Sequence, residues 1–392
     1  MSLTVVSLFT GAMGLDLGFE AEGFEVRLAV EKDPRAVETI EANRPRLPII
    51  DRDIADVTTD EILEKANLQP GEATVLTGGP PCEPFSTAGR RLSVQDRRAN
   101  AILEFMRVVN EARPRFFVFE QVPGFIRAAK RHISFYERVR KEKEGEELAP
   151  EERLGSAFDE LMAAFEGTGY TVSFDHASPS SSLLNAADFG TPQKRKRFIL
   201  VGARQPPLPP LPTPTHGDPG SHEVSLGVRQ QWMTLREAVN DLSDPCPEHL
   251  NFPSSWERFL DQVPPGGCWR DLPPELHEMA LGGAYDAEGS GLKGGRTGFL
   301  RRLSWDKPAP TVVDRPNTRA GCLCHPDELR PLSVREYARL QRFPDEWIFK
   351  GPLTARYQLI GQATPLPLAT AIARSIKEVA ERRAKPVSAV VR

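Results

Sequence analysis

The sequence predicts an α/β fold, with one domain built on a mostly parallel sheet and a second, smaller domain that is irregular. Three observations support this prediction. Short apolar runs alternate with helical patterns over the first 203 residues, a proline-dense stretch follows at 204–220, and residues 221–328 carry scattered Gly, Pro and Trp without a clear period. At 392 residues the chain is long enough for one large and one smaller domain.

The predicted sheet of the first domain comes from five apolar runs rich in Val, Ile, Leu and Phe. Helical patterns at 34–44 and 98–113 lie between these runs. A repeated order of strand, helix and strand indicates a parallel sheet covered by helices on both faces, which binds ligands beyond the carboxyl ends of its strands. The predicted strands are 3–9, 26–30, 73–78, 115–120 and 197–202.

The remaining segments set the domain boundaries. The charge-dense segment 127–158 predicts a solvated helix or a lid, and the prolines at 204–220 exclude sheet and helix and so mark a linker. Two helical patterns close the chain at 333–343 and 367–384, and the second is amphipathic and is expected to dock onto the first domain. We therefore expect a first domain at 1–204 that is completed by 330–385, a second domain at 205–329, and a tail at 386–392.

Composition narrows the class of protein. Apolar residues make up 40% and charged residues 27%, which is ordinary for a soluble globular chain, and no apolar run approaches the roughly 20 residues that span a bilayer. The N-terminus reads as a first strand and not as a signal peptide. Five scattered cysteines favour a reducing compartment, so we expect a cytoplasmic protein. A net charge of −4 does not point to nucleic acid, although a local basic cleft is compatible with it.

A glycine loop follows the first predicted strand. "SLFTGAMGLDLGF" has the spacing G-x-x-G-x-x-x-G and not the dinucleotide fingerprint G-x-G-x-x-G. Asp16 lies in the first helical turn and Glu31 closes the second strand, so acids flank the loop. Acids suit a cofactor that is positively charged and lacks phosphate, such as S-adenosylmethionine (AdoMet), with Asp53 and Ile54 at the edge and face of its adenine. A plain strand–helix turn with a surface acid explains these residues equally well.

A stiff loop holds a single cysteine at the end of the third apolar run. In "TGGPPCEPFS", residues 77–86, two glycines turn the chain and three prolines then fix it, which holds Cys82 in one place. This setting favours a nucleophile over an inert structural cysteine. Glu120 ends a very apolar strand, where burial would raise its pKa and keep it protonated, unless it simply faces water. The basic run 194–197 precedes the last strand, where such runs are often solvated loops.

Together these residues resemble the DNA (cytosine-5)-methyltransferase family, in its bacterial, AdoMet-dependent form. The match covers nearly the whole chain outside about 205–300, and the motifs stand in the order of that family. They are "SLFTGAMGLDLGF", "VEKD", "DI" at 53–54, "GGPPCEPFS", "FEQV", "QKRKR", "RRLSWDKPAPTVV", "RPLSVREYARLQRFP" and "YQLIGQATPLPLA". The resemblance implies a Rossmann-like methyltransferase domain and a target-recognition domain.

The resemblance also implies a role for each residue of a catalytic site. The nucleophile that attacks cytosine C6 falls on Cys82, the acid that contacts N3 and the exocyclic amine falls on Glu120, and the arginine that holds the base near O2 falls on Arg197, with Arg195 beside it. A stacked base is out of reach of such chemistry, so the cytosine must be flipped out. The implied cofactor residues are Phe9, Gly11, Gly14, Glu31, Asp53, Ile54, Pro80 and Gln362.

The implied partner is double-stranded DNA, bound by a monomer, with cognate restriction or defence proteins as further partners and no membrane. Cys-Leu-Cys-His at 322–325 is too cramped for a four-ligand zinc site without partners elsewhere, so we expect no metal. The candidate DNA-binding residues cannot be separated from ordinary surface charge on sequence alone. They are Arg90, Arg91, Arg301, Arg302 and Arg315, with Lys293 and Arg319 as further candidates.

Four positions depart from the pattern of the family. Glu83 stands where Gln is expected after the cysteine, Gln121 and Gln362 stand where Asn is usual, and Thr364 stands where Val is common. Glu83 is the departure that changes charge, since it sets an anion beside Cys82. The departures leave room for a catalytically impaired DNA-binding paralogue. The sequence is also compatible with an RNA cytosine-5 methyltransferase and, less well because the dinucleotide fingerprint is missing, with a Rossmann oxidoreductase.

Overall fold

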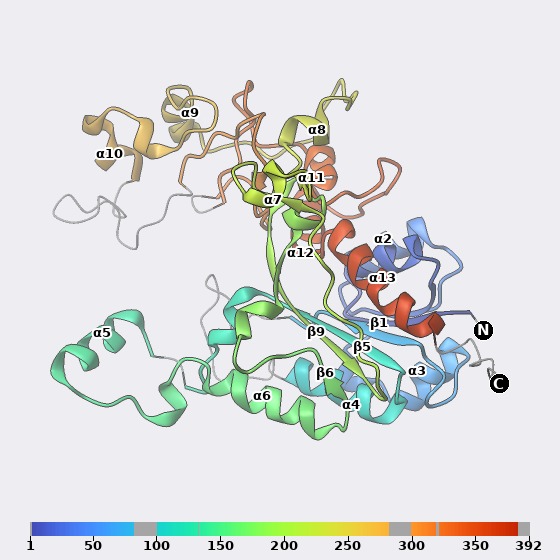
Figure 1. Cartoon of the computed structure of the whole chain (residues 1–392). Helices are drawn as coiled ribbons and strands as arrows, with labels where there is room; N and C mark the ends of the chain where they lie inside the picture. The colour runs from blue at the N-terminus through green and yellow to red at the C-terminus, as the bar shows by residue number, and fades with distance from the viewer. Residues whose placement is uncertain (1, 82–99, 132, 282–298, 319–320, 383–392) are drawn as a thin grey trace.

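The computed structural model describes residues 2–81, 100–131, 133–281, 299–318 and 321–382. Its centre is an eight-stranded sheet, in the order β3-β2-β1-β4-β5-β9-β6, with β7 also paired to β9 (Figure 1). All five predicted strands are present, and the mostly parallel sheet is confirmed. The strands are β1 (Thr4–Leu8), β2 (Glu25–Val30), β3 (Ile49–Ile50), β4 (Val75–Gly78), β5 (Phe116–Gln121), β6 (Thr171–Val172), β7 (Leu183–Asn185) and β9 (Lys196–Ala203).

The direction of β9 is the feature that the sequence did not reveal. Strands β1 to β5 pair in parallel, whereas β9 runs antiparallel to β5, with Glu120 opposite Ile199 and Gln121 opposite Phe198. The start of β9 therefore meets the end of β5. This reversal brings "FEQV" and "QKRKR", which are far apart in the chain, to the same edge of the sheet.

Helices cover both faces of the sheet, because alternate strand residues point to opposite sides. Phe117, Phe119 and Leu200 pack toward α3 (Thr59–Ala66), α4 (Asn100–Ala112) and α6 (Ser156–Gly167). Phe116, Val118 and Val201 pack toward α13 (Leu366–Arg382). Figure 1 shows α13 on the opposite side of the sheet from α4 and α6. Helix α2 (Pro34–Asn43) begins at the N-cap Asp33, whose side chain accepts a hydrogen bond from the Arg35 N–H.

The amphipathic C-terminal helix docks onto the first domain, as predicted. Two glycines of α1 (Gly14–Ala21) permit the contact with α13. A Cβ at Gly18 would lie 2.3 Å from the Cβ of Ala369, and one at Gly14 would lie 2.5 Å from the carbonyl oxygen of Thr364. The two ends of the chain therefore form one wall of the domain.

The charged segment forms α5 (Phe135–Glu144), which Ser134 and Gly145 cap and which stands away from the sheet in Figure 1. The solvated helix that the sequence predicted is confirmed, although the last three residues of the segment, 156–158, belong to α6 and are partly buried. None of the described helices combines the length and the apolar character needed to cross a membrane.

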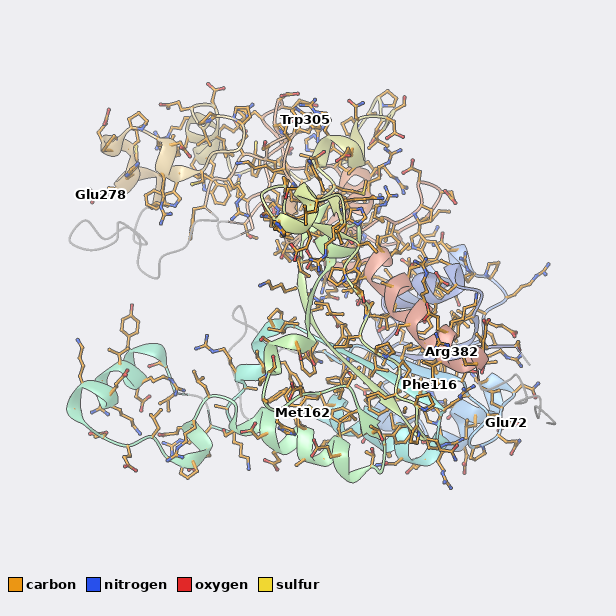
Figure 2. All side chains as sticks on the ribbon, in the orientation of Figure 1. Glu72, Phe116, Met162, Glu278, Trp305 and Arg382 are labelled. Atoms are coloured by element: carbon orange, nitrogen blue, oxygen red, sulfur yellow. The ribbon has the colours of Figure 1, made fainter. Side chains whose placement is uncertain are left out.

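The second domain has its own small core, between α9 (Ser254–Leu260) and α10 (Pro274–Leu281). Figure 2 labels Glu278 and Trp305 in this upper part of the molecule, and Met162 on α6 in the lower part. Parts of 205–329 pack elsewhere. Helix α8 (Leu235–Val239) and the strand β12 (Ala309–Pro310) share a hydrophobic cluster with α11 (Val334–Leu340) and α12 (Leu353–Gln362).

Candidate active site at the carboxyl edge of the sheet

Glu120 and Arg197 form an ion pair where β5 ends and β9 begins. Arg197 Nε lies 2.6 Å from Glu120 Oε1, and the two side chains are only 10% and 12% exposed. The contact is an ion pair without the alignment of a good hydrogen bond. Two groups assigned to one site by the sequence are therefore adjacent in space, in a nearly dry setting.

Burial governs the acidity of Glu120. It raises the pKa of this carboxyl, while the positive charges of Arg197 and Arg195 oppose the rise. The net direction is upward, so the protonated form persists to higher pH than in an exposed glutamate. A protonated carboxyl can donate a hydrogen bond to a ring nitrogen, which an ionised one cannot do.

The loop that leaves β4 is fixed to this pair. A Cβ at Gly79 would lie 2.9 Å from Glu120 Oε2, so a larger residue would displace the acid. The Gln121 side-chain amide donates to the Pro80 carbonyl oxygen at 2.6 Å. The loop therefore starts within contact of Glu120. Cys82, Glu83, Arg90 and Arg91 lie outside the described residues.

Arg195 takes a different position from its neighbour. It is 1% exposed, and its guanidinium donates to the carbonyl oxygens of Val312 at 2.8 Å and Gly361 at 2.6 Å. These bonds tie the strand to segments near the C-terminus. Both bonds are to backbone groups, so Arg195 holds the start of β9 against these two segments, beside Arg197.

The glycine loop has the strained backbone of a ligand site. Phe9 and Met13 have φ of 54° and 66°, in the left-handed region that non-glycine residues rarely adopt. Gly11 shares this conformation at φ 55°, and no atom lies within 4 Å of the place where its Cβ would stand. The loop is thus held in an unusual shape that leaves open space beside Gly11.

The acids that flank this loop are already oriented. One oxygen of Glu31 accepts from the Gly11 N–H at 2.8 Å, which fixes the loop to the end of β2. Asp53 pairs with Lys32 Nζ at 2.8 Å and caps a short 3₁₀ turn. Ile54 is 4% exposed and packs in the core, so its side chain leaves little surface for an adenine face.

The C-terminal motif closes the same region. The Thr364 carbonyl oxygen lies against Gly14, and Gln362 is exposed beside it. A hydrogen bond from Gln362 opposes the rise that burial causes in the pKa of Asp314. The loop near the N-terminus and the motif near the C-terminus therefore lie against each other, and no pattern in the sequence pointed to Asp314.

Asp16 is a second group whose environment the sequence did not reveal. It is fully buried, neither carboxyl oxygen has a well-formed hydrogen bond, and its pKa is raised to about 7. Burial is the main cause, and the nearby Ser7 hydroxyl opposes it. The sequence predicts an acid that flanks a cofactor or a surface acid, but Asp16 faces the sheet beneath the glycine loop.

The candidate DNA-binding arginines differ in their exposure and in their hydrogen bonds within the protein. Arg315 is exposed, whereas Arg301 is half-buried and burial lowers its pKa. The guanidinium of Arg302 donates to the Pro326 carbonyl oxygen at 2.8 Å and, at 3.4 Å, to two carbonyls that end α9 and follow it. Arg302 thus has a structural role within the second domain.

The cysteines of the 322–325 motif are inside the second domain. The Cys322 thiol points to the Arg301 carbonyl oxygen at 3.6 Å, and that of Cys324 to the Glu328 carbonyl oxygen at 3.5 Å. Burial raises the pKa of both thiols, to about 12 and about 11. Neutral thiols are poor metal ligands, and the described part of the chain has no cluster of His, Cys, Asp or Glu arranged for a metal ion.

A mostly parallel sheet with a strained glycine loop, oriented acids and a buried Glu–Arg pair at its carboxyl edge is typical of α/β enzymes, which bind their ligands at that edge. The sequence model of the C-5 cytosine-specific DNA methylase family matches residues 3–378 of this chain. The chain therefore belongs to that family.

Comparisons with individual proteins agree with this assignment. The type II methyltransferase M.Eco47II of Escherichia coli is 32% identical, over 97% of this chain and 80% of that protein. M.PspPI of Psychrobacter sp. is 34% identical, over 96% of this chain and 79% of that protein. Among solved structures, a protein described as a prophage-encoded DNA modification methyltransferase of E. coli has a TM-score of 0.60 at 21% identity, over 97% of this chain and 100% of that one. Entamoeba histolytica methyltransferase EhMeth has a TM-score of 0.58 at 13% identity, over 97% and 99%, and both likenesses show the shared fold.

Proposed function

We propose that the protein methylates carbon 5 of a flipped-out cytosine within a specific sequence of double-stranded DNA. The observation that carries the proposal is the buried Glu120–Arg197 pair, set against the start of the cysteine loop. We further propose that the enzyme serves a restriction-modification or other phage-defence system, as the type II names of its relatives suggest.

The residues around the glycine loop fit AdoMet. The open space beside Gly11 and the carboxylate of Glu31 suit a ribose, and Asp53 and Phe9 would lie toward the adenine. Acids without a nearby phosphate site suit a cationic sulfonium, and Gln362 would close the pocket from the C-terminal side. When bound, AdoMet supplies a methyl group on a positively charged sulfur.

The cytosine ring must be activated, because its C5 is a poor nucleophile. The Cys82 thiolate attacks C6 and forms the S–C6 bond, while Glu120 gives its proton to N3, so that electron density moves to C5. C5 would then take the methyl group as the bond between the methyl carbon and the sulfonium sulfur breaks and neutral S-adenosylhomocysteine leaves. Loss of H5 to a base, for which water suffices, and expulsion of the Cys82 thiolate restore the ring, and N3 returns its proton to Glu120.

Arg197 would fix the position of the cytosine relative to Glu120. Its Nε orients Glu120 and its Nη1 donates to the Lys196 carbonyl oxygen at 2.8 Å, and in the complex the guanidinium would also contact O2 of the cytosine. The base must leave the duplex to reach this edge of the sheet, at a few kcal/mol of unstacking. The second domain would hold the duplex and select the sequence.

Expression in a bacterial host that lacks cytosine methylation, followed by bisulfite sequencing, tests activity and target together. We expect 5-methylcytosine at one short sequence, and the Cys82→Ser variant should abolish it while leaving AdoMet binding nearly unchanged. A duplex with 5-fluorocytosine at that target should form an adduct that survives denaturant. Methylation of a tRNA in preference to the duplex, or AdoMet binding with no methylation of any DNA, would overturn the assignment.

A further inference from the structure

Asp314 is an exposed acid in the segment that follows β12. Strand β12 pairs in parallel with β8 (Gln193–Lys194), which directly precedes Arg195. The Arg195 guanidinium donates to the carbonyl oxygen of Val312 at 2.8 Å, just before Asp314 in the chain. These contacts bring Asp314 to the start of β9, where the candidate active site lies.

The backbone on either side of this contact is held firmly. The hydroxyl of the buried Tyr337 donates to the Val313 carbonyl oxygen at 3.0 Å and accepts from the Val313 N–H at 3.1 Å. A Cβ at Gly361 would lie 2.6 Å from the Val313 carbonyl oxygen and 3.0 Å from the Asp314 nitrogen, so the last turn of α12 packs directly on the segment. Asp314 therefore has a fixed place beside Gln362, the residue after Gly361.

The surroundings of the Asp314 carboxyl suit a base. The side chain of Gln362 hydrogen-bonds the carboxyl, which forms no ion pair within the described ranges. Burial by neighbouring groups raises its pKa, and three positive charges oppose the rise, those of Arg195, Arg315 and Arg197. The net direction is upward, so the carboxylate is a stronger base than that of a free aspartate. Because the residue is still exposed, it can exchange protons with water.

Carbon 5 of the cytosine must lie where the base site meets the cofactor site, because methyl transfer needs close contact between C5 and the donor. In the proposed function, Glu120 and Arg197 hold the N3 and O2 edge of the base, and Gln362 closes the cofactor pocket. Asp314 is hydrogen-bonded to Gln362 and lies within the electrostatic influence of Arg197. Its carboxyl is therefore placed between the two sites, on the side where C5 enters.

We propose that Asp314, acting through one water, is the base that removes H5 after methyl transfer. The inference rests on the proposed function. H5 passes as a proton to the water, which gives one of its own protons to the Asp314 carboxylate. The electron pair of the C5–H bond forms the C5=C6 double bond, the S–C6 bond breaks, and Cys82 leaves as a thiolate. Asp314 then releases the proton to solvent.

The other acids assigned to this region are engaged or out of reach. Glu31 accepts from the backbone of the glycine loop, and Asp53 is paired with a lysine. Asp16 is fully buried beneath the glycine loop. Glu120 is paired with an arginine and, in the proposed function, takes back the proton of N3. Asp314 is left as an exposed carboxylate that can receive the proton of C5.

The test separates proton removal from methyl transfer in the Asp314→Asn variant of the full chain. The target duplex identified by bisulfite sequencing carries tritium at C5 of the cytosine, and AdoMet carries a radiolabelled methyl group. In a single turnover, tritium released to water measures the loss of H5, and label on the DNA measures methyl transfer. We expect loss of H5 to slow by about a hundredfold while methyl transfer and AdoMet binding stay as in wild type.

A second readout follows from the same imbalance. In Asp314→Asn a methylated protein–DNA adduct that survives denaturant should accumulate on ordinary cytosine, whereas wild type should release its product. Asp314→Glu keeps a carboxylate and should recover much of the rate of tritium release. Asp306→Asn is the matched control, because Asp306 is an exposed acid of the same segment that pairs with Arg236 on the surface. It should match wild type in both rates.

Tritium release at the wild-type rate in Asp314→Asn would overturn the inference. An equal slowing of both steps without an adduct would also overturn it, since Asp314 would then only position its neighbours. Weaker AdoMet binding with tritium release intact would place Asp314 in the cofactor site instead of at C5. If wild type itself transfers no methyl group to DNA, the proposed function fails instead.

Discussion

The side-chain amide of Gln121 donates a 2.6 Å hydrogen bond to the Pro80 carbonyl oxygen, which joins the end of β5 to the loop that leaves β4. Gln121 is 1% exposed, so water does not compete for the contact. The residue that follows the candidate acid thus holds the loop that leads to the candidate nucleophile.

Shortening this side chain should slow the reaction. Gln121→Asn is one methylene shorter and would lose the bond unless the backbone moves, so kcat should fall by about three- to tenfold, and Gln121→Leu should cost more. The measurement is kcat beside the AdoMet dissociation constant for each variant. A purely structural role would instead lower thermal stability and leave kcat per folded molecule intact.

Glu120 predicts a pH dependence of the rate. The raised pKa of this buried carboxyl keeps it protonated at pH values where exposed glutamates are ionised, and the proposed reaction uses the protonated form. The rate of the chemical step should therefore decline as pH rises through the pKa of Glu120 in the folded enzyme. Single-turnover rates measured across pH 5 to 9 would show this limb.

Glu120→Gln supplies the comparison. The amide can donate a hydrogen bond but cannot transfer a proton to N3, so the rate should fall by about a hundredfold or more, and the limb assigned to Glu120 should disappear. A profile with the declining limb unchanged in Glu120→Gln would assign this titration to a group other than Glu120.

Much of the fold could be predicted from the chain because the signals are local. The strands over 26–30 and 115–120 are short apolar runs, and α2 has a capping Asp33 followed by proline, so each is set by its own residues. The pairing of Glu120 with Arg197 in one site was also predictable, through the motifs that carry the resemblance. Local sequence and motif order were sufficient for these.

Longer-range features were not predictable. The reversal of β9 depends on the path that the chain takes through α5 and α6, which no residue in "RFILVG" encodes. The burial of Asp16 follows from the packing of α1 over the sheet, which sets this carboxyl beside Ser7 of β1. Arg195 and Arg197 are both arginines two positions apart in one basic run, so the local sequence does not distinguish them. They differ only in their tertiary partners, since Arg195 donates to the backbone of Val312 and Gly361.

Asp16 predicts that the protein is less stable at high pH than it would be without this carboxyl. Its pKa rises from 3.8 in an exposed state to about 7 in the folded protein, so the folded state holds the proton over this range and the unfolded state does not. Stability therefore decreases as pH rises from about 4 to about 7, by roughly 4 kcal/mol, and is constant above.

Asp16→Asn removes this titration. It should raise the free energy of unfolding at pH 8 and change it little at pH 4.5, where the wild-type carboxyl is protonated in the folded state. Urea unfolding at both pH values measures the difference. Asp60→Asn, at an exposed position in the first turn of α3, is the control. It should change the free energy of unfolding by the same amount at both pH values. Equal effects of the two substitutions at pH 8 would show that Asp16 is not a buried acid.

The close contact at Gly18 predicts that packing between α1 and α13 affects both stability and AdoMet binding. Gly18→Ala would set a Cβ 2.3 Å from that of Ala369, and since backbone atoms of α13 lie within 2.7 Å, the helices must separate. We expect a loss of about 1–3 kcal/mol in stability and weaker AdoMet binding, because α1 begins at the glycine loop and α13 follows Thr364. Gly167→Ala, at the end of α6 where no atom lies within 4 Å of the new Cβ, is the matched control. It should leave AdoMet binding unchanged, and an equal loss of AdoMet binding in both variants would disconnect the packing of α1 on α13 from the cofactor site.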